Sequence, residues 1–251
     1  MDFSLDLLWL ILIGFIAGCI NVISGGGSLL TLPILIFFGL PPSVANGTNR
    51  IAIIIQNIFA VKGFKSKGVA TFPFSTYVAI SATAGAILGA SIAIDIKGEL
   101  FNRILAVIMV VIVIYMVIKP KTGNQQLLER ITGKHLWISI IIFFFIGIYG
   151  GFIQAGVGFL ILLALSGINR LSLVKSNAIK VFVALVYSVF ALAIFVYNDK
   201  INWMYGLILS LGNAAGGWFM SRWSVKKGDG LVKVFLIIMV TAMAIKLWFY
   251  Q

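Results

Sequence analysis

The fold depends on one stretch, Ser24-Gly25-Gly26-Gly27, which separates two apolar segments at residues 5–23 and 28–40. Each glycine in a helix costs about 1 kcal/mol relative to alanine, so three in succession favour an interruption. Interrupted backbone at membrane depth is tolerated only where it is buried in protein or lines a wet cavity. The stretch therefore predicts a helix that enters a membrane, stops, and returns as a second helix.

The rest of the chain is equally apolar. Its 251 residues are 61% hydrophobic and 10% charged, and the mean hydropathy is +1.10, whereas soluble domains are about 45–50% apolar and about 25% charged. Residues 69–94, 136–167 and 201–221 contain no Lys, Arg, Asp or Glu, and about 20 helical residues cross a bilayer core. Isolated strands would leave unpaired backbone groups in lipid. We predict an all-α polytopic membrane protein with about 8–10 transmembrane segments.

A polar linker at residues 119–135 divides two similar halves. We predict a first transmembrane repeat at 1–118, a cytoplasmic linker at 119–135, and a second transmembrane repeat at 136–251. The predicted helical segments are 5–23, 28–40, 43–61, 70–94 and 104–118 in the first repeat, and 136–153, 159–168, 173–197, 201–221 and 234–250 in the second.

Similar residues recur between the halves at an offset of 130 positions. The pairs are Gly26 with Gly156, Val44 with Val174, Arg50 with Lys180, Arg103 with Lys233, and Met109 with Met239. At an offset of 127, Gly85 and Gly89 match Gly212 and Gly216, whose small-residue spacing suits helix packing faces. Internal duplication is common in secondary transporters.

Charge predicts the relative orientation of the halves. If the first segment of each half enters and returns, all the basic loops fall on one side of the membrane, which the positive-inside rule makes cytoplasmic. This arrangement is an inverted repeat in the cell (inner) membrane, with both termini outside. Eight simple spans are the alternative. A cleavable signal peptide is disfavoured because residues 1–7 carry Asp2 and Asp6 and no basic residue.

The helix interruptions are the first candidate site. A helix that starts at such an interruption presents free N–H groups and a positive dipole end, which bind anions. Ser28 is placed to cap this helix with its hydroxyl. The candidate substrate-binding residues here are Ser24, Gly25, Gly26, Gly27 and Ser28, with Gln154 and Gly156 in the second half. The alternative is that these glycines serve only close helix packing.

The second candidate site is a pair of polar clusters, each early in a hydrophobic segment. A cation at a helix centre in lipid costs about 2.5–3.5 kcal/mol, so it is seldom idle there. Arg50 would offer a planar fork to an oxyanion and Lys180 a point charge. The alternative is that both cations reach the headgroups. The candidate residues are Asn46, Thr48, Asn49, Arg50, Asn177 and Lys180.

Several function classes are disfavoured. The net charge of +12 resides mainly in short loops, as in polytopic proteins, so we expect no nucleic-acid partner. The single cysteine, Cys19, excludes an internal disulfide, and we expect no metal and no cofactor. No carboxylate lies deep in a predicted span, no phosphate-binding loop is present, and no Ser-His-acid set lies at membrane depth. We therefore do not expect an enzyme.

The motif Ser24 to Pro33 (SGGGSLLTLP), followed by Gly47-Thr48-Asn49, resembles the TauE/SafE sulfite exporter family, also called the toluene-sulfonate uptake permeases. The resemblance covers nearly the whole chain. It implies transport of sulfite, organosulfonates or related small anions, with the Gly25–Ser28 region and Thr48 facing the substrate. The second half departs from the motif, with Asn177-Ala178-Ile179 in place of Gly47-Thr48-Asn49.

The predicted function is that of a secondary transporter, an exporter of a small anion such as sulfite or an organosulfonate, bound at mid-membrane between two discontinuous helices. The expected partners are the anion and the lipid bilayer, and homo-oligomerisation is left open. An uptake permease, a passive channel and a non-transporting accessory subunit are the alternatives.

Overall fold

The structure, a computed structural model, describes residues 3–118, 128–223, 241–246 and 248–249. The prediction of an all-α chain is confirmed for these residues, which contain no strand. The helices are α1 (Phe3–Ser24), α2 (Ser28–Phe37), α3 (Pro42–Lys65), α4 (Phe74–Ala93), α5 (Gly98–Ile118), α6 (Gly133–Phe152), α7 (Val157–Gly167), α8 (Leu173–Tyr197) and α9 (Trp203–Trp223), and residues 241–246 are also helical.

Two of these helices, α2 and α7, are short, and each follows a long helix after a brief non-helical segment. Gly25 adopts φ +80°, where an L side chain is strained, and Gln154 and Gly156 adopt φ 65° and 70°. The predicted cap by Ser28 is wrong. Gly27 occupies the N-cap position of α2 without a side-chain hydrogen bond, and Ser28 is the first helical residue, since the helix begins one residue earlier than a serine cap requires.

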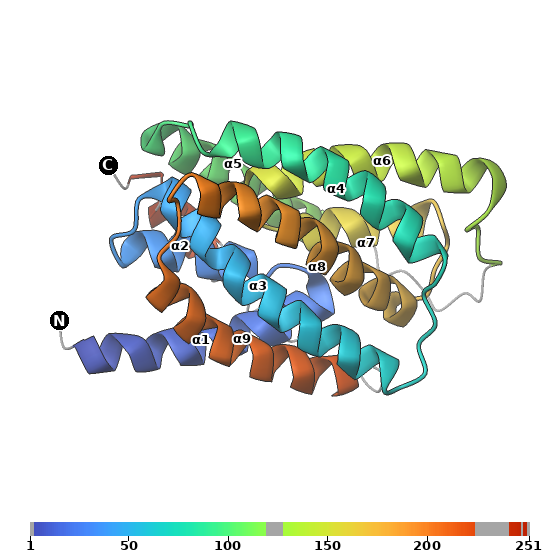
Figure 1. The fold of residues 1–251 in the computed structure, drawn as a ribbon, viewed down its shortest axis with the longest axis horizontal. Coiled ribbons are helices and arrows are strands. Elements are labelled where there is room, and N and C mark those ends of the chain that lie inside the picture. Colours follow the sequence, from blue (N-terminus) through green and yellow to red (C-terminus); the bar gives the residue numbers. More distant parts are fainter. Residues whose placement is uncertain (1–2, 119–127, 224–240, 247, 250–251) are drawn as a thin grey trace.

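The helices pack across the two halves of the chain. α1 of the first half lies along α9 of the second, α4 of the first lies along α6 of the second, and α3 lies against α8 and α9. These partners come from distant parts of the sequence, as the blue and red-orange helices show (Figure 1). The halves are therefore interlocked, and each long first helix is held by the other half.

Glycine faces make the two long crossings possible. A Cβ added at Gly89 would lie 1.9 Å from the carbonyl oxygen of Ile148 on α6. One added at Gly212 would lie 2.0 Å from the carbonyl oxygen of Ile11 on α1. Small residues let helix backbones approach this closely. The predicted packing role of the paired glycines is confirmed.

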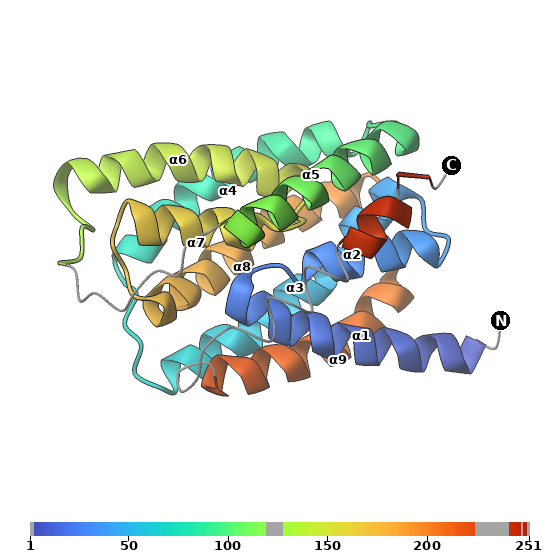
Figure 2. The same ribbon diagram turned by 180° about the vertical axis from the view of Figure 1, so that it is seen from behind.

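The chain has two chemically different ends. The first residues of α1 and the loops 38–41, 94–97 and 198–202 lie at one end of the molecule, whereas the loops 66–73 and 168–172 and the last turn of α9 lie at the other (Figures 1 and 2). The second end carries the basic residues Lys62, Lys65, Lys67, Arg170, Lys175 and Arg222. α1 runs inward from the first end, and α2 runs back to that same end.

Four helices of the described residues are long and apolar enough to cross a membrane: α1 (over Leu7–Ser24), α4, α6 and α8. α2 and α7 are apolar but shorter. α5 begins at Gly98, earlier than predicted, and its first turn carries an exposed ion pair between Glu99 and Arg103. Lys233, Met239 and most of the predicted segment 234–250 lie outside the described residues.

Candidate functional site

The two helix interruptions touch each other. A Cβ added at Gly25 would lie 2.4 Å from the Cα and carbonyl carbon of Gly158, so the two backbones are in direct contact. A Cβ at Gly156 would lie 3.4 Å from the side chain of Leu29, in the first turn of α2. The amino ends of α2 and α7 therefore lie next to each other inside the protein, although their sequences are well over 100 residues apart.

These amino ends hold hydrogen-bond donors that have no acceptor. Among the described residues, no hydrogen bond is donated by the backbone N–H groups of Gly26, Gly27 or Ser28, nor by those of Gly156 and Gly158. All five residues are buried. Unpaired buried N–H groups are rare in native proteins because each costs free energy comparable to a lost hydrogen bond. The two ends therefore present a surplus of donors toward the interior.

The carboxyl ends of α1 and α6, just before the interruptions, are capped by side chains from the other half of the chain. Arg50 of α3 reaches the last turn of α6, where Nη1 donates to the carbonyl of Gly150 (3.2 Å) and Nη2 donates to the carbonyl of Gly151. Asn46, one turn earlier on α3, donates from Nδ2 to the carbonyl of Phe152 at 2.7 Å. The last carbonyls of a helix have no partner within it, and here α3 supplies their donors.

Lys180 makes the corresponding contact with α1. Its Nζ donates to the carbonyls of Asn21 (2.7 Å) and Val22 (2.9 Å), at the carboxyl end of α1, and to Oδ1 of Asn177 (2.6 Å). Asn177 in turn donates from Nδ2 to the carbonyl of Ile23 at 3.3 Å. An asparagine and a cation from each half thus cap the interrupted helix of the other half.

These reciprocal caps leave the interior of the protein positively charged. The carboxyl ends of α1 and α6 carry partial negative charge, which Lys180 and Arg50 offset, while the amino ends of α2 and α7 keep their partial positive charge. The acidic residues of the described chain lie at helix ends or in loops, where Glu99 and Glu129 form exposed or half-exposed ion pairs. In the part of the chain that the structure describes, the positive charge and the free donors are therefore not matched by an internal carboxylate.

Two further donors lie buried beside the interruption. Thr31, in α2, donates its hydroxyl to Oδ1 of Asn49 at 2.6 Å, and Nδ2 of Asn49 has no acceptor among the described residues. Nε of Arg50 also meets no acceptor within the described part of the chain, and the guanidinium lies 4.8 Å from the centre of the Phe195 ring. Asn49 and Arg50 are both fully buried. Sequence reasoning missed Thr31 and Phe195, because neither residue type signals a site by itself.

The remaining predicted residues have varied surroundings. The Ser24 hydroxyl donates to the carbonyl of Ile20 at 3.0 Å, within its own helix. Oε1 of Gln154 accepts from Arg50 at 3.3 Å. Thr48 faces a different neighbour, since its hydroxyl oxygen accepts from the backbone N–H of Asn202 at 2.8 Å, at the loop before α9. The structure thus groups most of the predicted residues around the interruptions, whereas Thr48 contacts the loop before α9.

The site is closed in this structure. The polar residues of α3 from Asn46 to Arg50 are buried. A surface cavity of about 500 Å³ lies between α3 and α9, lined by Phe59, Lys62, Ala214, Ala215 and Trp218, rather than at the interruptions. The donors at the interruptions are therefore shielded from the surface of the molecule in this structure.

The known proteins that are similar to this chain are described as membrane transporters. The model of the "Sulfite exporter TauE/SafE" family matches residues 10–247. A "Probable membrane transporter protein ORF9" of Sinorhizobium sp is 29% identical, with 98% of this chain and 94% of that protein covered. A "Probable membrane transporter protein" of Haemophilus influenzae is 27% identical over 100% of this chain and 98% of its own length. The "Probable membrane transporter protein YfcA" of Escherichia coli (strain K12) is 26% identical over 95% and 88%.

No solved structure matches the chain. The family match spans both halves and includes both interruptions and both capping clusters. Together with the apolar helices, it establishes that the chain belongs to the TauE/SafE family and is a membrane transporter of that family.

Proposed function

We propose that the chain is a secondary transporter that binds a small oxyanion at mid-membrane, between the amino ends of α2 and α7. The observation that carries this proposal is the buried surplus of donors, formed by backbone N–H groups of both interruptions with Asn49 and Arg50, and lacking an internal carboxylate among the described residues. An anion supplies the missing acceptors and negative charge. Interrupted helices hold substrates in this way in other transporters.

The proposal includes an inverted repeat, with units at 1–118 and 136–251 joined by a cytoplasmic linker at 119–135. The reciprocal caps support it, because Arg50 relates to α6 as Lys180 relates to α1. The collection of basic residues at one end also supports it, since this end would face the cytoplasm of the cell (inner) membrane and leave both termini outside (Figure 1).

The proposed substrate class is sulfite or an organosulfonate, and the proposed direction is outward. The family description supports the class, and the charge of the site supports an anion. With a negative cell interior, moving one anion outward gains about 2.3 kcal/mol per 100 mV. The membrane potential alone would then drive efflux, with no need for a proton-carrying carboxylate.

Counterflow in vesicles tests this function. Purified protein in liposomes is expected to exchange labelled sulfite or sulfonate with saturation, and an imposed potential is expected to change net flux in the direction that moves negative charge toward the positive side. A panel of sulfur oxyanions, sulfonates and carboxylates would rank the substrates. Linear, non-saturating flux would indicate a channel, the absence of any flux would indicate an accessory subunit, and flux indifferent to potential would exclude electrogenic uniport.

Asn49→Asp is expected to weaken anion binding at least tenfold, because a carboxylate beside the free donors competes with the substrate and repels it. Binding can be measured as the shift in melting temperature with added sulfite. Asn198→Asp, at the loop end of α8, adds the same charge away from the site and should leave binding nearly unchanged. Equal binding by both variants would remove Asn49 from the site.

A further inference from the structure

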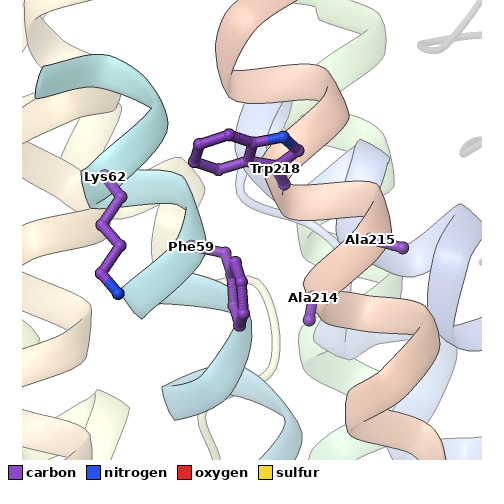
Figure 3. A pocket seen from close by; sticks show the side chains of 5 residues that line it. All are labelled: Phe59, Lys62, Ala214, Ala215 and Trp218. Atoms are coloured by element: carbon purple, nitrogen blue, oxygen red, sulfur yellow. The ribbon is translucent and has the colours of Figure 1, made fainter. Parts of the chain in front are cut away.

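The cavity between α3 and α9 is a groove on the outer surface of the helix bundle. Its volume is about 500 Å³, within the range of about 300–1,000 Å³ typical of small-ligand sites. Phe59 stands between the two helices, and Trp218 reaches toward α3 from the facing helix (Figure 3). The two rings make an edge-to-face contact, with centroids 6.4 Å apart. Alanines 214 and 215 form the shallow α9 side.

The groove opens onto a surface that is suited to hydrocarbon. The lining residues Phe59 and Trp218 are themselves exposed large hydrophobic residues, as are Ile58 and Leu211 on the same two helices. In a membrane protein such a surface faces lipid chains, so the occupant of the groove comes from the bilayer.

Two cations lie near one end of the groove: Lys62 lines it, and Arg222 lies beside it on α9, one turn beyond Trp218. Nζ of Lys62 lies 5.9 Å from the centre of the Phe59 ring. The guanidinium of Arg222 lies 5.0 Å from the centre of the Trp218 ring. The stem of Arg222 also lies against α3, since a Cβ added at Gly63 would be 3.6 Å from its Cγ. The two cations therefore flank the same helix crossing, at the basic end of the molecule.

We propose that this groove binds one anionic phospholipid, with an acyl chain lying along Ala214 and Ala215 against the rings of Phe59 and Trp218, and with the phosphate at Lys62 and Arg222. Charge complementarity favours an anionic headgroup over a zwitterionic one, because each cation near a membrane surface strengthens the attraction of anionic lipid. A guanidinium also pairs well with phosphate oxygens. The neighbouring Trp223 fits the headgroup level, where tryptophans concentrate.

Native mass spectrometry of the full chain, titrated with phosphatidylglycerol or phosphatidylcholine in detergent, tests the site. The wild type is expected to bind one phosphatidylglycerol more tightly than phosphatidylcholine. Lys62→Gln with Arg222→Gln should weaken phosphatidylglycerol binding about twenty-five-fold, roughly fivefold for each charge. Ala215→Leu, which keeps both cations and fills the groove, should also weaken it at least fivefold.

The matched control is Lys65→Gln with Lys67→Gln, which removes the same charge from exposed positions outside the groove. This variant should keep wild-type affinity within about twofold, and melting temperatures should show that all the variants are folded. Equal loss in the control would reduce the effect to general surface charge and overturn the proposal. Equal binding of both lipids would also overturn the proposal. So would a mass spectrum in which the chain is a dimer that carries no lipid, because a second copy would then cover the groove.

Discussion

Gly25→Ala is expected to abolish transport and to lower the free energy of unfolding by about 3 kcal/mol or more. Two costs add at this position. Its φ of +80° costs a residue with a Cβ about 1–2 kcal/mol. The new Cβ would also lie 2.4 Å from the backbone of Gly158, and overpacking of this kind typically costs about 1–3 kcal/mol. The contact between the two interruptions would open.

Two other glycines each carry only one of these two costs, the backbone strain at Gly39 and the steric clash at Gly158. Gly39→Ala carries the same strain, because φ is +88°, but meets nothing within 4 Å, so it should lose only about 1–2 kcal/mol and keep transport. Gly158→Ala meets the backbone of Gly25 at 2.3 Å without a positive φ, and should lose transport through the clash alone. Melting temperature and counterflow measure both effects. If Gly25→Ala behaved like Gly39→Ala, the contact between the interruptions would have no role.

Arg50→Gln is expected to have a comparably large effect, with a loss of about 3 kcal/mol in stability and most of the transport. The guanidinium donates to two carbonyls at the end of α6. Hydrogen bonds to charged groups contribute about 1.5–3 kcal/mol each, and the carbonyls would stay buried without donors. Arg50→Lys should recover part of the stability, because an ammonium can still reach one carbonyl.

Arg103→Gln is the matched control, since that arginine is exposed and forms its ion pair with Glu99 of the same helix. Exposed pairs contribute little, so the stability change should stay below about 0.5 kcal/mol. Arg50→Gln should also weaken anion binding by about 1–3 kcal/mol, measured on the correctly inserted protein. Unchanged affinity with reduced stability would show that Arg50 only caps α6.

Much of the architecture could be predicted from local patterns. Apolar runs of membrane-spanning length predict helices because lipid offers no partner to backbone groups. Three successive glycines predict the end of α1, and the paired glycines of α4 and α9 predict close packing. These signals are local, since each depends on residues within a few turns of one another. The cap predicted for Ser28 is wrong because a shift of one residue decides whether a serine caps a helix or begins it.

The partners of the buried cations could not be predicted in this way. Arg50 and Lys180 are recognisable as costly charges in apolar segments, but nothing near either in sequence identifies the carbonyls that it meets. Those carbonyls belong to helices about 100 and 158 residues away. The cations were expected to face the substrate or the headgroups, and their bonds to helix ends depend on the way the halves interlock.

The sequence by itself determined that this chain is an all-α membrane transporter of the TauE/SafE family with glycine-interrupted helices, because hydropathy, glycine content and family similarity are properties of the linear order. Only the tertiary structure decided that the interruptions touch at Gly25 and Gly158 and that each half caps the other's helix. The physical reason is that unpaired carbonyls and free donors are defined by what surrounds them, and in this protein their surroundings come from the opposite half of the chain.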